Sequence, residues 1–146
     1  MSGEGHRRSL WLSWSPCSGA ESDETWGVGY FAVEPSVVDT VGAEVGDLSP
    51  VLVLLDSNHS ADHVLRELAA YADLATVGSR CIVCDTVIDL LPSEMHEDRP
   101  WGPGDSPAMA VEEFLQANLG FQAEACIDER LALSVAPRGY LRRIAY

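Results

Sequence analysis

Two aspartates and a histidine stand out because they follow apolar runs, where polar side chains can do chemistry. Asp56 follows the run 51–55, His59 comes three residues later, and Asp85 follows the run 81–84. Two carboxylates suit a hard divalent cation such as Mg²⁺, which completes its octahedron with water and substrate oxygens. His59 could then take the proton of a metal-bound hydroxyl, whose pKa the metal lowers.

Each of these residues also has a structural interpretation, and spacing alone does not decide between the two. Aspartates at strand ends cap helices or brace loops, and a histidine in a turn can bond the backbone. Trp101 lies in a Pro/Gly-rich loop, where it either pins the loop down or forms a wall of a substrate pocket. We take Asp56 and Asp85 as candidate metal ligands, His59 as the candidate catalytic base and Trp101 as the candidate substrate-binding residue. His63 and His96 are expected to be solvated.

The elements around these residues predict that they meet. The run 51–55 has no polar alternation, which is typical of a strand buried on both faces of a parallel sheet. Ser60 can cap a helix over 61–72, and a second strand is expected over 81–84. This βαβ unit should have parallel strands about 4.8 Å apart, so Asp56 and Asp85 should converge at the sheet edge where α/β proteins bind ligands.

The remaining elements follow from similar patterns. A short strand is expected over 30–33, helices over about 35–45 and 107–118, and two final strands over 121–126 and 131–135. The loop 91–107 holds four of the eight prolines. Long irregular loops in compact domains are usually lids or binding loops. This one should fold over the strand ends and bring Trp101 toward Asp56 and His59.

Composition excludes several classes of function. A net charge of −14 over 146 residues argues against nucleic acid as the main partner. No apolar run reaches about 18 residues, so no transmembrane helix is expected. The N-terminus lacks the apolar core of a signal peptide, which makes a cytoplasmic location the default expectation. All nine basic residues are arginine, which leaves histidine and carboxylates for proton transfer.

The cysteines and the N-terminal segment carry little functional signal. Cys81 and Cys84 should point to opposite faces of a strand, so we expect buried small side chains instead of a metal pair. Residues 1–29 show no sustained period and are expected to form a disordered segment before an α/β domain over 30–146. Gly27 and Gly29 precede an apolar run instead of following a strand, which makes them a weak dinucleotide-binding signal.

Four stretches together resemble the cephalosporin hydroxylase family, which also covers rhamnosyl O-methyltransferases. They are VLVLLDSNHSADHVLRELAAYADLATVGS (51–79), CIVCDTVIDLLP (81–92), DRPWGPGDSPAMAVEEFL (98–115) and LALSVAPRGYLRRI (131–144). The most specific parts are LDSNHS (55–60) and RPWGPGD (99–105). The resemblance implies an α/β fold of the S-adenosylmethionine (SAM)-dependent methyltransferase type, here a partial Rossmann-like sheet with a βαβ unit and a C-terminal strand pair.

The resemblance also implies a function and a metal site. The family's divalent-metal site uses an Asp at the end of one strand and an acidic pair at the end of the next. Asp56 matches the first ligand and Asp85 the second residue of the pair, while Cys84 stands where some members have an acid. His59 falls where related metal-dependent O-methyltransferases place their base. The implied activity is SAM-dependent methylation, assisted by Mg²⁺ or a similar cation, of a hydroxyl on a sugar or small natural product.

The N-terminal part departs from the family pattern. The family's glycine-rich SAM loop follows the first strand and an acidic ribose-binding residue ends the second, and neither is recognisable before Val33. The alternative is therefore a non-catalytic fragment that keeps only the metal and substrate half and does not bind SAM usefully. A truncated gene, a wrong start or a frame error upstream of Tyr30 would explain such a fragment. The expected partner is a small-molecule substrate, and a homo-oligomer is possible.

Overall fold

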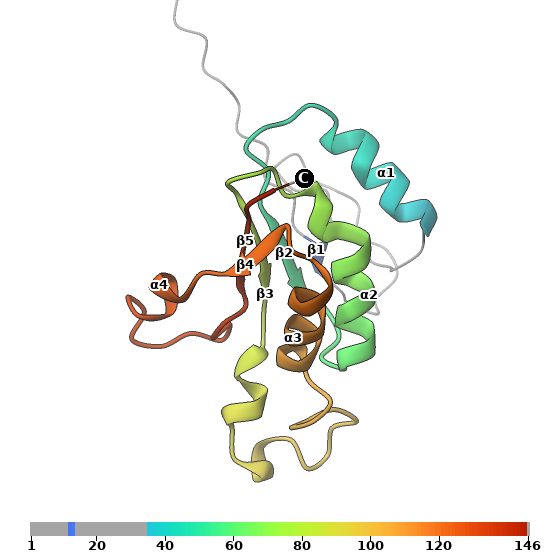
Figure 1. Cartoon of the computed structure of the whole chain (residues 1–146). Coiled ribbons are helices and arrows are strands. Elements are labelled where there is room, and N and C mark those ends of the chain that lie inside the picture. Colours follow the sequence, from blue (N-terminus) through green and yellow to red (C-terminus); the bar gives the residue numbers. More distant parts are fainter. Residues whose placement is uncertain (1–11, 14–34, 146) are drawn as a thin grey trace, which may run out of the picture.

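The computed structural model describes residues 12–13 and 35–145, and these form a mixed α/β fold. One five-stranded sheet has the order β1-β2-β3-β5-β4 (Figure 1). Strands β1, β2 and β3 are parallel, and β5 runs antiparallel to both β3 and β4. The strands are β1 (Leu12–Ser13), β2 (Val53–Asp56), β3 (Arg80–Val83), β4 (Phe121–Ala123) and β5 (Tyr140–Arg143).

The helices include two that pack together against one face of this sheet. In Figure 1, α2 and α3 lie side by side in front of the strands. The α-helices are α1 (Pro35–Val45), α2 (Ala61–Tyr71), α3 (Pro107–Ala117) and α4 (Ala125–Asp128), and the short 3₁₀ helices are η1 (Ala72–Leu74), η2 (Thr86–Leu90) and η3 (Ser93–Met95). No helix in the described ranges is long and apolar enough to cross a membrane.

The predicted βαβ unit is confirmed as β2-α2-β3. Val53 pairs with Cys81 and Leu55 with Val83 in parallel register. These four side chains are buried, and Val64, Leu68 and Tyr71 of α2 cover them. Leu54 is only half-buried and Leu52, just before the strand, is 48% exposed, so the prediction of burial on both faces holds for one face of β2 only.

The C-terminal strand pair differs from the prediction in its second member. Residues 131–135 form no strand, because Leu131, Leu133 and Val135 are 43%, 93% and 57% exposed and have no neighbouring strand. The strand that pairs with β3 is β5, whose Leu141 is fully buried. The first member, β4, ends at Ala123 because α4 begins at Ala125.

Gly139 allows β5 to approach the end of β3. Its carbonyl accepts a hydrogen bond of 2.9 Å from the Val83 N–H. A Cβ at this position would lie 2.2 Å from the Val83 carbonyl oxygen, so only glycine fits without moving the backbone. The contact fixes the point where the chain leaves the sheet toward Asp85.

Two predictions for the N-terminal part fall on positions that are largely not described. The strand expected over 30–33 lies outside the described residues. The disordered segment expected over 1–29 also lies outside them, except for Leu12 and Ser13, which pair with Leu55 and Asp56.

Candidate metal centre

Asp56, His59 and Asp85 meet at the edge of the sheet where β2 and β3 end. Asp56 is the last residue of β2, and Asp85 follows β3 by two residues. One ligand atom from each of the three side chains lies within 4.8 Å of the others. The structure therefore brings together the three residues that the strand pattern placed at one edge, while their roles remain predictions.

The backbone of Asp85 directs its side chain toward the cluster. Asp85 has a positive φ of 57°, in the left-handed region that Asp and Asn tolerate better than most residues. This conformation turns the chain from β3 into η2. Asp85 Oδ2 then lies 2.8 Å from His59 Nε2, and the two side chains are 31% and 27% exposed.

The electrostatics of the cluster favour a cation. The pKa of Asp56 is raised, first because the carboxyl is partly buried and then because the Asp85 carboxylate is close; His59 opposes this shift. A bound divalent cation would offset both causes by stabilising the two negative charges. Two carboxylate oxygens are suitable donors for a hard divalent cation such as Mg²⁺.

The two cysteines of the βαβ unit do not belong to this donor set. Cys81 is buried, and burial raises the pKa of its thiol. Cys84 is half-buried, and its pKa is raised to about 11 by burial and by the charges of Asp56 and Asp85. The Cys84 thiol is therefore protonated near neutral pH, unlike a carboxylate at the same position.

Trp101 lies against the imidazole of His59, as the loop prediction required. The two ring centroids are 4.7 Å apart and the planes are tilted by 32°. The loop that carries Trp101 leaves β3 through η2 and η3, as the lower part of Figure 1 shows. Trp101 is half-buried. This placement fits both a hydrophobic pin and a pocket wall.

Asp105 anchors the loop to the start of α2, in a role that the sequence assigned to Ser60. Ser60 occupies the N-cap position, but its side chain makes no capping hydrogen bond. Asp105 Oδ1 instead accepts a 2.7 Å hydrogen bond from the Ala61 N–H. A carboxylate is favourable there because helix N-termini carry partial positive charge. No local signal reveals this cap, since the two residues are 44 positions apart.

His96 is buried within the loop, so the expectation that it is solvated is wrong. It is only 9% exposed, and its Nδ1 has no hydrogen-bond partner among the described residues. Its ring packs against Gly102, where an added Cβ would lie 3.0 Å from His96 Cδ2. The loop therefore closes over its own histidine, next to Trp101.

Glu67 is a buried carboxylate that the sequence reasoning missed. It is 8% exposed on α2, and burial is the main reason that its pKa is raised. Its Oε2 and the buried Ser57 Oγ both lack hydrogen-bond partners in the described part of the chain. Helical spacing places Glu67 on the inward face of α2, together with Val64, Leu68 and Tyr71. Its burial could therefore have been predicted from the periodicity of the sequence.

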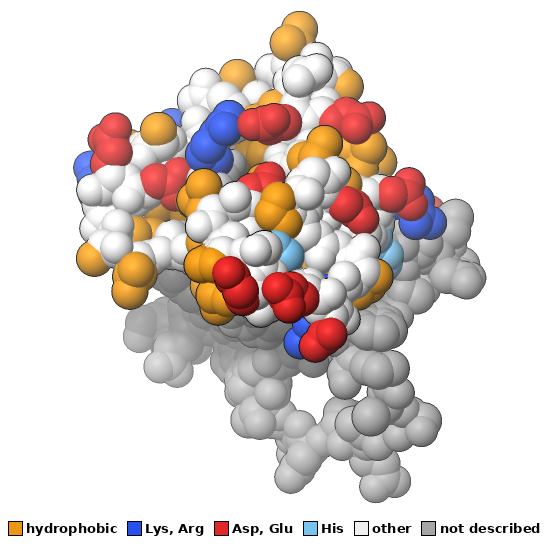
Figure 2. All heavy atoms as spheres, turned by 90° about the horizontal axis from the view of Figure 1, so that it is seen from below, with side chains coloured by type: hydrophobic (Ala, Val, Ile, Leu, Met, Phe, Trp, Pro, Cys, Tyr) orange, Lys and Arg blue, Asp and Glu red, His pale blue; other side chains and the backbone are white. Residues whose placement is uncertain are grey.

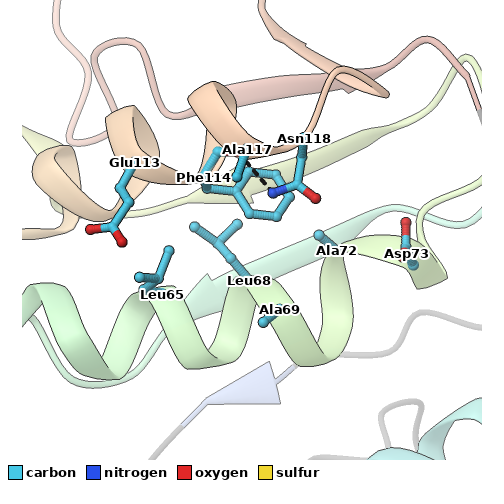
Figure 3. Close-up of a pocket in the computed structure, with 9 residues that line it drawn as sticks. All are labelled: Leu65, Leu68, Ala69, Ala72, Asp73, Glu113, Phe114, Ala117 and Asn118. Carbon is cyan, nitrogen blue, oxygen red and sulfur yellow. Dashed lines mark hydrogen bonds between the residues drawn. The ribbon is translucent and has the colours of Figure 1, made fainter.

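A hollow between α2 and α3 has none of these residues in its lining. Its volume is about 300 Å³, and Figure 3 shows its mainly apolar lining. We call it the α2–α3 groove; its lining residues are Leu65, Leu68, Ala69, Ala72, Asp73, Glu113, Phe114, Ala117 and Asn118. None of the candidate site residues lines it.

A mixed α/β fold with a carboxylate–histidine cluster at its strand ends is common to many enzymes, and comparison narrows the class. The family model for rhamnosyl O-methyltransferase/CmcI matches residues 28–144. The chain belongs to this family of methyltransferases. No curated protein and no solved structure matches the chain significantly.

Proposed function

We propose that this protein is a SAM-dependent O-methyltransferase that uses a divalent cation, Mg²⁺ or a similar ion, to methylate a hydroxyl of a sugar or small natural product. The observation that carries the proposal is the convergence of Asp56, His59 and Asp85 beneath Trp101. The family assignment supplies the reaction class. The mixed sheet is compatible with the C-terminal part of a Rossmann-like methyltransferase fold.

Asp56 and Asp85 would hold the cation. When bound, the cation would supply Lewis-acid chemistry, because it lowers the pKa of a hydroxyl at the site. The raised pKa of Asp56 is consistent with a carboxylate that needs a positive partner. The two residues also fix the orientation of the acceptor, which contributes through proximity.

His59 would take the acceptor's proton. Its Nε2 contacts Asp85 Oδ2, so Nδ1 is the ring atom left to receive the proton when Nε2 carries a hydrogen. Asp85 would stabilise the imidazolium that results. When bound, SAM would supply the methyl group: the acceptor oxygen would take it from the sulfonium sulfur, and S-adenosylhomocysteine would be the product.

Trp101 would cover the reacting group. Its ring lies over the imidazole of His59, where it reduces the access of water to the base. On this proposal, Trp101→Ala weakens acceptor binding more than SAM binding, because the indole lies with the residues that handle the hydroxyl.

Calorimetry of the full chain tests the metal and SAM parts separately. We expect Mg²⁺ or Mn²⁺ to bind the wild type and Asp62→Asn, but not Asp56→Asn. Asp62 is a matched control because it is exposed and pairs with Arg66 on α2. Transfer of a labelled methyl group from SAM to a set of hydroxyl compounds should require the cation and His59.

The outcomes separate the two functional alternatives. Metal binding that survives both Asp56→Asn and Asp85→Asn would contradict the proposed centre. Metal binding that requires both aspartates, without any SAM binding, would instead favour the non-catalytic alternative.

A further inference from the structure

Arg99 is a cationic side chain that the proposed reaction does not use. It lies on the same loop as Trp101, with its guanidinium carbon 5.6 Å from the centroid of the indole ring. The indole in turn lies 4.7 Å from the imidazole of His59. Two successive ring contacts therefore connect Arg99 to the metal-centre candidates.

Arg99 has no carboxylate partner within the described part of the chain. Of the seven arginines there, five form ion pairs within 4.0 Å. Among these described arginines, only Arg99 and Arg130 form none. Arg99 follows Glu97 and Asp98 directly in sequence, and the whole chain has 23 acidic residues against nine basic ones. Partners are abundant, yet the exposed guanidinium lies over Trp101 instead of beside a carboxylate.

The backbone beneath Arg99 is well fixed. The Arg99 N–H donates a 3.0 Å hydrogen bond to the His96 carbonyl. His96 is buried under Gly102, and Asp105 bonds the start of α2. A cation on an anchored loop loses less freedom on binding a ligand than one on a free loop, which strengthens the interaction.

The acidic side chains around Arg99 indicate what kind of ligand would need its positive charge. Figure 2 views the molecule from the loop's end and shows more acidic than basic side chains on that face. The proposed cation would offset the charges of Asp56 and Asp85, but not those of the acidic face around the loop. An anionic acceptor would be repelled by this surface without a local positive group, whereas a neutral acceptor needs none.

We propose that Arg99 selects acceptors that carry an oxyanion, a carboxylate or a phosphate, beside the hydroxyl to be methylated. The inference rests on the proposed function and adds the substrate class to it. The planar guanidinium can donate two parallel hydrogen bonds to either group. The indole of Trp101 places the guanidinium at the edge of the site, so the oxyanion would lie on the loop side of the acceptor and the hydroxyl on the Asp56 side.

Three sugars that share their ring hydroxyls and differ at C6 test this inference. They are glucose, glucuronate and glucose 6-phosphate, titrated by ligand-observed NMR against the full chain with Mg²⁺ present. We expect at least one of the two anions to bind the wild type about tenfold more tightly than glucose, which corresponds to roughly 1.4 kcal/mol. The two anions distinguish a carboxylate from a phosphate ligand.

Variants of the arginine complete the test. Arg99→Gln should remove the preference for the anion and leave glucose binding unchanged, while Arg99→Lys should keep part of it. Arg130→Gln is the matched control, since Arg130 also lacks an ion pair, and it should keep the full preference. Raising the salt concentration should reduce the preference in the wild type and in Arg130→Gln, as expected for an exposed charge, and should have no effect in Arg99→Gln.

Two results would overturn the inference. The wild type could show no preference for either anion, including the case in which none of the sugars binds. Arg99→Gln could weaken glucose and the anions equally, which would show that Arg99 only packs on Trp101. Mg²⁺ binding measured in the same samples separates these results from failure of the proposed function, because that function requires the metal site and not Arg99.

Discussion

The cluster of Asp56, His59 and Asp85 and the α2–α3 groove differ in the chemistry of the side chains that form them. The groove has a volume of about 300 Å³ and is lined mainly by apolar side chains, among which Leu68 and Phe114 also belong to the buried core. The cluster at the strand ends consists of three partly exposed titratable side chains. The groove therefore belongs to the packing of α2 against α3, whereas the converging donor atoms of the cluster mark the place for chemistry. Stability and ligand binding should respond to different substitutions.

The largest effect on stability is expected at the groove. Leu68 is 1% exposed and lines the groove while contributing to the core. Leu68→Ala should lower the free energy of unfolding by about 2–5 kcal/mol, because it removes buried methyl groups and leaves a cavity. Denaturant unfolding measures this change.

Mg²⁺ affinity should not change in the folded Leu68→Ala protein. Leu119→Ala is the control, since that side chain is 86% exposed and should alter neither quantity. A loss of Mg²⁺ affinity in Leu68→Ala under conditions where the protein is folded would show that groove and cluster are coupled.

At Asp56 we expect a large effect on Mg²⁺ affinity and no loss of stability. Asp56→Asn should weaken Mg²⁺ binding by roughly 100-fold or more, since it removes a direct ligand and even groups behind a ligand cost 10–100-fold. Metal-free stability should stay constant or rise, because the substitution removes a carboxylate whose pKa is raised by burial and by Asp85. Calorimetry and thermal unfolding without metal measure the two effects, and a marked loss of metal-free stability would contradict the separation.

The parallel strands β2 and β3 and the cluster at their ends could be predicted from the sequence, because the patterns that indicate them are local. The apolar runs 51–55 and 81–84, each followed by an Asp, defined β2 and β3 to within two residues at each end. Pairing of these two strands then determined where Asp56 and Asp85 meet. The apolar alternation of 131–135 was misleading, because it lacks a neighbouring strand and its side chains stay exposed.

The features that could not be predicted depend on contacts between distant residues. Asp105 caps α2 from 44 positions away, and Arg80 of β3 pairs with Glu124 across the same separation. His96 is buried because Gly102 closes over it, which its polar sequence neighbours do not indicate. Burial of Glu67, by contrast, follows from helical spacing and could have been predicted.

Glu67, on the buried face of α2, should give stability a pH dependence. Its pKa is raised in the folded protein relative to the ordinary value of 4.5. A raised pKa means that the folded state binds the proton more tightly, so this contribution to stability is present at low pH and is lost as pH rises through the folded pKa. Glu67→Gln removes the contribution, and the stability of the variant relative to wild type should increase with pH.

Chemical unfolding of wild type and Glu67→Gln at several pH values measures this difference. Glu113→Gln is the control, because Glu113 is exposed at the groove and the comparison therefore sets a buried carboxylate against an exposed one. The interpretation fails if Glu67→Gln and Glu113→Gln show the same pH dependence.

The smallest expected effect concerns the contact that holds the loop over the cluster. In Gly102→Ala, the new Cβ would lie 3.0 Å from His96 Cδ2, so the buried ring or the loop must shift by a few tenths of an ångström. We expect a loss of stability of about 1 kcal/mol and a weaker contact between Trp101 and His59. The ring-current shift of the His59 protons in NMR spectra reports that contact.

His96→Ala should restore room for the new methyl group, so the double variant should be more stable than the sum of the single changes predicts. Gly42→Ala provides a control in α1, because its Cβ would meet Leu74 Cδ2 at an ordinary 3.9 Å and should instead stabilise the protein by roughly 0.5–1 kcal/mol. If Gly102→Ala leaves the His59 shift unchanged, the packing of Gly102 on His96 does not position Trp101.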